Sequence, residues 1–276
     1  MTLSLLWAVL IVIAADALAI GAMLLVRRRA PEGSFFADGD RASGVFGVLA
    51  TCFAIFAGFV IFLAFTTYDQ SRTGADAEAL LITQQYETAQ FLPAPTRRRL
   101  GGELVCYARS VVHQEWPQME EGIKSNSINP WSLALFRTVR AAEPKTPTEQ
   151  TALGKWFDQT SDREEARRDR IHGAAGITPI SLWIVLVLTA VVLFTYMLFF
   201  ADSAEMARSQ CMLIGSAATV VVVTLLAIYA LSHPYRPGLG SIRPTAIEHT
   251  LSRLDQARTA LNAKAPIPCN AAGYAT

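Results

Sequence analysis

The sequence has little charge, and it lacks the short motifs by which most enzyme classes are recognised. Charged residues make up 17% of the chain, against about 25% in a typical soluble domain. The net charge is only +1, so no basic surface for nucleic acid is expected. No nucleotide-binding glycine loop, nucleophile elbow or zinc-ligand pattern occurs. We therefore predict that the chain is not an enzyme, requires no cofactor or metal, and binds no nucleic acid.

Cysteine is also scarce, with four residues in the chain. Cys52 and Cys211 lie in apolar runs and are expected to be packing residues. Cys106 and Cys269 lie in polar segments that are separated by two apolar runs, so both belong on the same side of a membrane. They can form a disulfide if that side is oxidising. Two unconnected thiols are the alternative.

What the sequence has in abundance is long apolar runs, each longer than the roughly 20 residues that a helix needs to cross a bilayer. They cover residues 3–26, 44–66, 178–201 and 211–232. We predict an all-α, polytopic membrane protein with four transmembrane helices in two hairpins. Its expected parts are a first hairpin (1–66), a helical extramembrane insert (67–177), a second hairpin (178–232), and a C-terminal helix and tail (233–276). The first run has no basic segment before it and is expected to be a retained helix.

The distribution of arginines gives two opposing indications of orientation. Arg27, Arg28 and Arg29 follow the first apolar run directly, which places that end of the helix in the cytoplasm and the insert outside it. Arg72 and a group of arginines before residue 178 favour the opposite orientation; this group is Arg163, Arg167, Arg168 and Arg170. We predict an insert outside the cytoplasm, since the arginine triplet is the most local signal and a disulfide would agree with it.

The second apolar run combines aromatic and small residues. Phenylalanines recur mostly every three residues and so do not form one stripe, but some cluster with Val60 on one side of the helix. In a symmetric oligomer such a face can form a hydrophobic constriction, whereas ordinary packing or lipid contact is the alternative. The candidate pore-lining residues are Phe46, Phe53, Phe56 and Val60. The small residues that would allow close helix packing are Gly47, Ala50, Ala54 and Gly58.

Asp16 is the one formal charge deep in an apolar run. A carboxylate in hydrocarbon costs about 3 kcal/mol or more, so Asp16 should face protein or water. It can be a functional residue, namely a proton or cation site or a gating contact, or it can be a protonated or hydrogen-bonded helix-packing residue.

The polar insert shows helix signals throughout. The second run is expected to continue as a helix to about Phe91, before Pro93 and Pro95 end it. Asn129-Pro130 and the capping box at Thr146–Glu149 each predict a helix start. We expect Pro117 to end a helix at Glu115-Trp116. The C-terminal helix carries an apolar seam that needs a partner, either the insert or a neighbouring subunit; the seam is Ile247, Leu251, Leu254 and Leu261.

Several segments together resemble the bacterial bestrophin-like family, four-span proteins with a helical insert. The matching segments are Glu78-Ala79-Leu80-Leu81, Glu115-Trp116-Pro117-Gln118-Met119, the arginine group before the third run with Trp183, and His233-Pro234-Tyr235-Arg236-Pro237-Gly238. The resemblance implies a multi-pass protein of the bacterial inner membrane. A distant likeness to bestrophins implies a homo-oligomeric anion channel lined by the second helix. Bestrophins place their large domain in the cytosol, which conflicts with the orientation predicted above, and no acidic calcium-binding run occurs here.

Two functional hypotheses follow. The first is an oligomeric ion channel or pore, with the second helix at the axis and the insert as a vestibule. Its partners would be the lipid bilayer, further copies of the chain and small ions. The alternative is a non-conducting membrane scaffold or sensor whose insert binds an envelope partner. The number of subunits distinguishes them, since a pore of this kind requires a closed ring around an axis.

Overall fold

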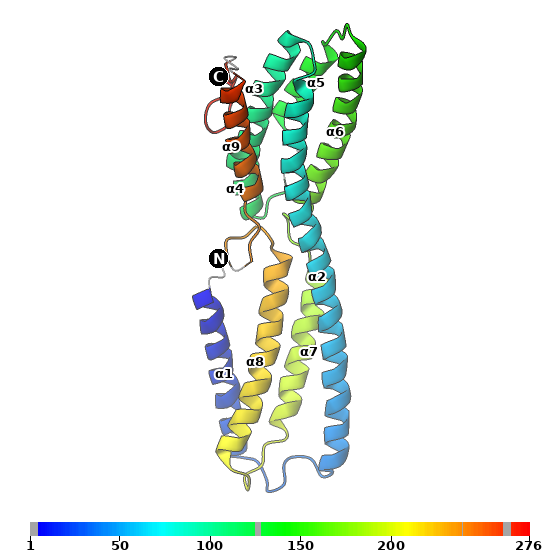
Figure 1. Ribbon diagram of the computed structural model, residues 1–276. Helices are drawn as coiled ribbons and strands as arrows, with labels where there is room; N and C mark the ends of the chain where they lie inside the picture. Colours follow the sequence, from blue (N-terminus) through cyan, green and yellow to red (C-terminus); the bar gives the residue numbers. More distant parts are fainter. Residues whose placement is uncertain (1–4, 125–127, 239, 262–265) are drawn as a thin grey trace. The chain divides into compact units, whose positions relative to one another are not determined.

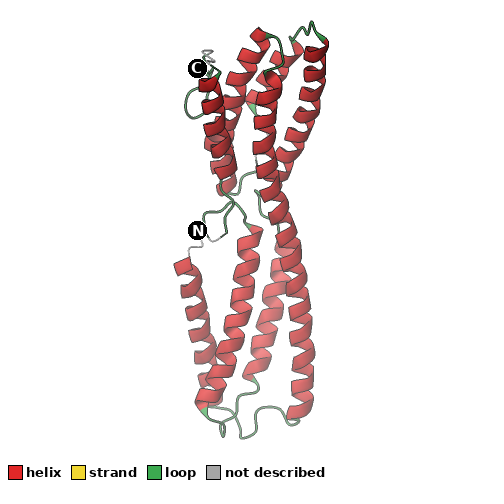
Figure 2. Cartoon of the chain, in the orientation of Figure 1, coloured by secondary structure: helices red, strands yellow, loops and turns green. Residues whose placement is uncertain are grey.

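The computed structural model describes residues 5–124, 128–238, 240–261 and 266–276, and the regular elements in these ranges are all helices (Figure 2). Residues 3 and 4 of the predicted first span lie outside the described residues. The helices in chain order are α1 (Leu5–Arg27), α2 (Gly39–Ala89), α3 (Ala94–Ser110), the π-helix η1 (Val111–Glu115), α4 (Trp116–Glu120), α5 (Pro130–Arg140), α6 (Pro147–His172), α7 (Ile180–Leu198), α8 (Ala207–Ser232) and α9 (Thr245–Ala260).

Four of the described helices are long and apolar enough to cross a membrane: α1, α2, α7 and α8. They coincide with the four predicted runs, and α2 continues well beyond its apolar part. The prediction of an all-helical protein with four membrane spans is therefore confirmed. The chain divides into two units, and α2 contributes its first part to one and its second part to the other.

The first unit comprises residues 1–66, 176–232 and 237–240. Consecutive helices are joined by short links, but side-chain packing pairs each helix with one from the other hairpin. Helix α1 lies beside α8, and α2 lies beside α7 (Figure 1). Phe53 and Ala57 of α2 pack against Leu186 and Ala190 of α7. The two hairpins thus form one four-helix unit.

Both links of the first unit are tied together. Arg27, at the end of α1, donates to the carbonyl oxygens of Asp202 and Ser203, each at 3.1 Å. Phe36 stacks on Tyr196 of α7 with ring centroids 5.1 Å apart. Arg27 therefore has a structural role in addition to the topological one that the sequence suggested.

The second unit comprises residues 67–175, 233–236 and 241–276. The predicted helix starts are confirmed: the Asn129 side chain accepts from the Trp131 amide, and Thr146 and Glu149 form a capping box. Most of the apolar seam of α9 finds its partner in this unit: Ile247 and Leu254 are buried in its core and Leu251 packs against it. Leu261 is exposed and follows the end of α9, so it does not belong to the buried seam.

The expectation that Pro117 ends a helix at Glu115-Trp116 is wrong. The helix changes from α3 to the π-helix η1 at Val111 and continues as α4 to Glu120. Proline has no amide proton, but it is tolerated at the first turn of a helix. The wider turn of η1, in which the Trp116 amide bonds to the Val111 carbonyl, places Pro117 in the first turn of α4. The helix therefore continues through Pro117 without a break, and the extra residue in the π-turn rotates the side chains that follow it.

Candidate functional site

A buried ionic network within the second unit joins three of the segments that carry the family resemblance, whereas Trp183 packs in the first unit. Arg170 of α6 donates to both carboxylate oxygens of Glu78 on α2, and its Nη2 also donates to Glu115 of η1 at 2.5 Å. The side chains of Arg170 and Glu78 have no exposed area. Three stretches of sequence that lie far apart thus join at one guanidinium group.

Glu115 is the second acid of this network. Arg167 donates to its Oε1 at 3.0 Å, and Asn129 donates to the same oxygen at 2.9 Å. Because Asn129 also caps α5, this helix is fixed to the network through a single side chain. The π-helix sets the rotation of Glu115, since an extra residue in the turn redirects the side chains that follow it.

Arg163 lies one helical turn before Arg167 and has a different environment. Its Nη1 donates to Gln85 of α2 at 2.7 Å, and its guanidinium lies 4.6 Å from the centroid of the Tyr107 ring. The Tyr107 hydroxyl in turn donates to Glu78 at 2.5 Å. Tyr107 therefore contacts Arg163 through its ring and the acid that pairs with Arg170 through its hydroxyl.

Burial and charge pairing have opposite effects on these groups. Burial raises the pKa of Glu115, but Arg170 and Arg167 lower it by more, to about 2. Burial lowers the pKa of Arg170, and the carboxylates of Glu78 and Glu115 raise it above its usual value. Burial and the charge of Glu78 raise the pKa of the Tyr107 hydroxyl well above its usual value. Glu115 is therefore ionised, Arg170 is charged and Tyr107 is neutral across the physiological range.

Two further contacts hold the backbone around Arg170 in place. Tyr235, from the segment after α8, donates its hydroxyl proton to the Arg170 carbonyl oxygen, and its ring packs edge-on against Trp116. Gly74 of α2 faces α6, and a Cβ at this position would lie 2.6 Å from the Arg170 amide nitrogen. A glycine is thus required where α2 passes the arginine.

The chemistry of this arrangement is structural. The charges of Arg170, Glu78 and Glu115 are matched by buried partners, and Tyr107 is a hydrogen-bond donor rather than a base. The described residues contain no group of three or more histidines, cysteines or acids that could hold a metal ion. The network locks α2, α6 and η1 together, since separating them would leave charges buried without partners.

The predicted pore-lining residues lie inside the first unit. Phe53 and Val60 are buried against α7, Phe56 packs on the edge of the same cluster, and Phe46 stacks on Tyr196. Among the predicted packing residues, Gly47, Ala54 and Gly58 are exposed, and Ala50 is partly covered by the cluster. Within a single chain, the residues predicted to line the pore therefore lie in or against the cluster shared with α7, and three of the four predicted packing residues are exposed.

Asp16 accepts a hydrogen bond from Thr219 of α8 at 2.8 Å. Its Oδ1 atom is buried and has no hydrogen-bond partner among the described residues. Of the two interpretations of Asp16, this contact supports the helix-packing one, because it joins the two helices that lie side by side in the first unit.

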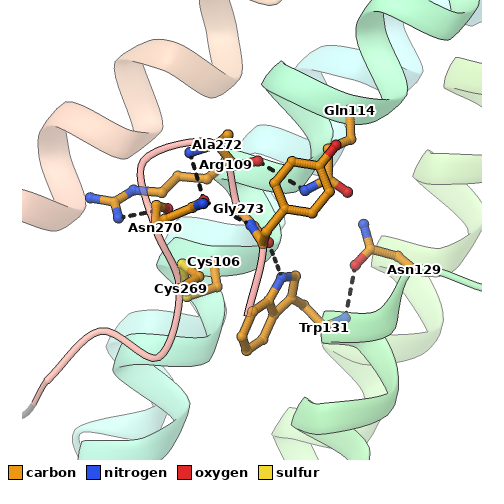
Figure 3. The surroundings of a disulfide bond; sticks show 10 residues. Cys106, Arg109, Gln114, Asn129, Trp131, Cys269, Asn270, Ala272 and Gly273 are labelled. Atoms are coloured by element: carbon orange, nitrogen blue, oxygen red, sulfur yellow. Dashed lines mark hydrogen bonds between the residues drawn. A yellow bond between two sulfur atoms is a disulfide. The ribbon is translucent and has the colours of Figure 1, made fainter. Parts of the chain in front are cut away.

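Cys106 and Cys269 form a disulfide in the second unit. It fastens the C-terminal tail to α3, and further hydrogen bonds hold the tail there (Figure 3). Trp131 donates its indole proton to the Gly273 carbonyl at 2.7 Å, and Gln114 donates to the Ala272 carbonyl at 2.9 Å. Gly273 has φ +81° and lies against the backbone of Ser110, so no other residue fits there without strain.

Comparison with solved structures places this fold among known proteins. A crystal structure of a bacterial bestrophin homologue from Klebsiella pneumoniae, carrying a point mutation, has a TM-score of 0.67 at 15% identity and covers 88% of this chain and 98% of that chain. A second variant of the homologue has a TM-score of 0.63 at 14% identity, with coverages of 90% and 98%. A structure described as a membrane protein has a TM-score of 0.61 at 14% identity, with coverages of 93% and 99%. At such low identity these likenesses show the fold.

A search of curated proteins finds no match. The sequence model described as the Bestrophin-like domain matches residues 13–247, which is most of the chain. Together with the four membrane helices and the buried network that joins three of the resembling segments, this match shows that the chain belongs to the bestrophin-like family.

Proposed function

We propose that this protein is a homo-oligomeric anion channel of the bacterial inner membrane, with the outer face of α2 around the axis. Membership of the family and the likeness to bestrophin homologue structures support a channel. The assignment of α2 to the axis rests on how this helix packs. One face of α2 is buried against α7, and no other part of the same chain covers the opposite face.

This exposed face has the composition that a pore-lining helix needs. It consists of Gly44, Val48, Thr51, Ile55, Gly58 and Phe62, which recur at helical spacing and are all exposed in the single chain. The glycines allow helices of neighbouring subunits to approach one another closely. The apolar side chains between them can form a constriction that closes by excluding water.

Because Phe53 and Val60 are buried within the subunit, we no longer assign them to the pore lining. An axis residue must reach the outside of its own subunit, whereas these two side chains fill the space between α2 and α7. We therefore assign the constriction to Ile55 and Phe62, and we assign Phe53 and Val60 to subunit stability.

Flux measurements on purified protein test the proposal. The protein is sized in detergent and reconstituted in liposomes, and the reversal potential is measured under a chloride gradient. We expect a closed ring of subunits and a current that reverses near the chloride potential. A dimer without flux in any gradient would exclude a channel and favour a non-conducting scaffold.

Two matched substitutions on α2 test which face lines the axis. Phe62→Ala should widen the constriction and raise flux with little effect on unfolding. Phe53→Ala should leave the pore unchanged but lower stability by about 3 kcal/mol, because it creates a cavity against α7. Higher flux from Phe53→Ala than from Phe62→Ala would return the axis to the aromatic face.

A further inference from the structure

The second unit contains a large cavity away from the buried ionic network. Its volume is about 1130 Å³, which is ample for a small molecule. The walls come from the end of α2, from α3, from α5, from α9 and from the C-terminal tail. Neither the family resemblance nor the proposed channel gives this cavity a role.

Positive charge dominates the lining. Arg97, Arg98 and Arg99 come from the first turns of α3, and Arg258 comes from α9. Neither Arg98 nor Arg99 forms an ion pair with a described residue, and the Arg97 guanidinium donates to the Gln90 carbonyl at 3.2 Å. Guanidinium groups bind carboxylate and phosphate oxygens through pairs of parallel hydrogen bonds. The cavity is therefore suited to an oxyanion.

One acid lines the same cavity and lacks half of its hydrogen bonds. The Oε1 atom of Glu103 accepts from the Thr138 hydroxyl at 2.8 Å. Its Oε2 atom is buried and has no partner among the described residues. A buried carboxylate oxygen without a donor is costly, so a small turn of the Glu103 side chain that brings this atom to a donor on a ligand would be favoured.

The surrounding structure keeps the cavity open. A Cβ on Gly101 would lie 3.3 Å from the Tyr86 ring and 3.9 Å from Nη1 of Arg258, so a side chain here would take up space beside that arginine. Pro266 and Pro268 of the tail belong to the lining, and the neighbouring Cys269 is bonded to Cys106 of α3. The tail is thus held in place as one side of a built site.

We infer that this cavity binds a small phosphate compound that also carries an ammonium or hydroxyl donor. The phosphate lies among the guanidinium groups of Arg98, Arg99 and Arg258, and the donor bonds to Oε2 of Glu103. A soluble phosphate monoester and the headgroup of phosphatidylethanolamine share this chemistry. The dianionic phosphate monoester neutralises more of the positive charge of the arginines than the lipid headgroup does.

Calorimetric titration of the full-length protein in detergent, at low salt, tests the inference with three soluble probes. Phosphoethanolamine carries both groups, ethyl phosphate carries the phosphate alone, and ethanolamine carries the ammonium alone. We expect phosphoethanolamine to bind best, ethyl phosphate to bind more weakly and ethanolamine not to bind. Short-chain phosphatidylethanolamine forms the fourth arm; binding of this lipid without binding of the soluble probes assigns the site to a headgroup.

Substitutions then locate the site. Arg98→Ala and Arg258→Ala should each weaken phosphoethanolamine binding by about tenfold, the usual effect of losing a charged hydrogen-bond partner. Glu103→Gln should weaken phosphoethanolamine but not ethyl phosphate. Arg253→Ala is the matched control, since it removes one exposed charge from α9 outside the cavity.

Two results would overturn the inference. One is the absence of binding by all four probes to correctly folded wild-type protein. The other is equal weakening by Arg253→Ala and Arg258→Ala, which would show that only the diffuse charge of the surface is at work. Arg98 is exposed, so its variant keeps the test usable even if Arg258→Ala folds poorly.

Discussion

Arg170 donates to both carboxylate oxygens of Glu78 in a pair of which neither side chain is exposed to solvent. The two residues are separated by more than ninety positions in sequence and come from different helices. Removing one member of such a pair leaves an isolated charge in the protein interior. The free-energy cost of that isolated charge is far larger than the cost of burying the pair. The pair therefore fixes how α2 and α6 meet.

The first prediction concerns this pair. Arg170→Met should destabilise the second unit by about 3–5 kcal/mol, because Glu78 and Glu115 would remain buried close to each other without the shared cation. The measurement is thermal or denaturant unfolding in detergent, followed by near-ultraviolet circular dichroism. Arg168→Met is the control, since Arg168 lies on the same helix but is exposed, and a surface substitution should change stability by about 0.5 kcal/mol or less. Equal effects of the two substitutions would contradict a structural role for the network.

The second prediction concerns pH. The pKa of Glu115 is lowered from 4.5 to about 2 in the folded protein. A lowered pKa means that the stabilisation is fully present above pH 4.5 and is lost as the pH falls from 4.5 towards 2. The loss from this group is roughly 3 kcal/mol. Glu115→Gln should remove that part of the acid sensitivity, and this is measured by unfolding at several pH values. A variant whose stability falls as steeply as that of wild type would rule out Glu115 as the source.

The third prediction concerns the close approach at Gly74. Gly74→Ala places a Cβ against the backbone of α6, so either the helices separate or the arginine moves. We expect a loss of stability of about 1–3 kcal/mol, the usual range for overpacking. Gly154→Ala is the control, because Gly154 lies in α6 with open space around its Cα and should be unaffected or slightly stabilised.

The fourth prediction concerns the disulfide and the orientation of the insert. We expect Cys106 and Cys269 to be oxidised to each other in protein from cells, which non-reducing peptide mapping by mass spectrometry measures. The chain-entropy model gives a stabilisation of at most about 5 kcal/mol for so long a loop. Replacing both cysteines by serine should lower the unfolding temperature.

The same orientation predicts where reporters work. We predict an insert outside the cytoplasm, so alkaline phosphatase inserted after Glu143, in the exposed link between α5 and α6, should be active. An inactive phosphatase together with an active cytoplasmic reporter at this position would reverse the orientation. Free thiols at both cysteines would remove the support that the disulfide gives to it.

The sequence alone predicted where the membrane spans lie and where two helices start, but not which helices pack together. Length and hydropathy gave four spans, and the caps at Asn129 and Thr146 gave two helix starts, because these signals are local. The pairing of α1 with α8 and of α2 with α7 depends on contacts between distant residues, which one sequence does not contain. The face of α2 that meets an axis also depends on such contacts, since Phe53 suits a position against α7 or at an axis equally well by composition.

The arginine group before α7 illustrates the same limit. Read by the positive-inside rule, it favours a cytoplasmic insert. In the structure Arg163, Arg167 and Arg170 are buried in the ionic network, whereas Arg168 is exposed. Most of these residues thus have a reason to be present that is independent of topology. A signal was available in the spacing: Arg163, Arg167 and Arg170 are four and three residues apart and so share one face of a helix.

The disulfide also constrains the order of biosynthesis. Cys106 belongs to the insert, while its partner lies in the tail beyond α7 and α8. The bond can form only after both of those helices have been inserted and the tail has reached the compartment of the insert. The thiol of Cys106 must therefore stay available until translation ends. Oxidation of Cys106 by Cys269 therefore requires that both helices of the second hairpin cross the membrane. A chain in which α8 fails to insert would keep a free thiol at Cys106 in α3.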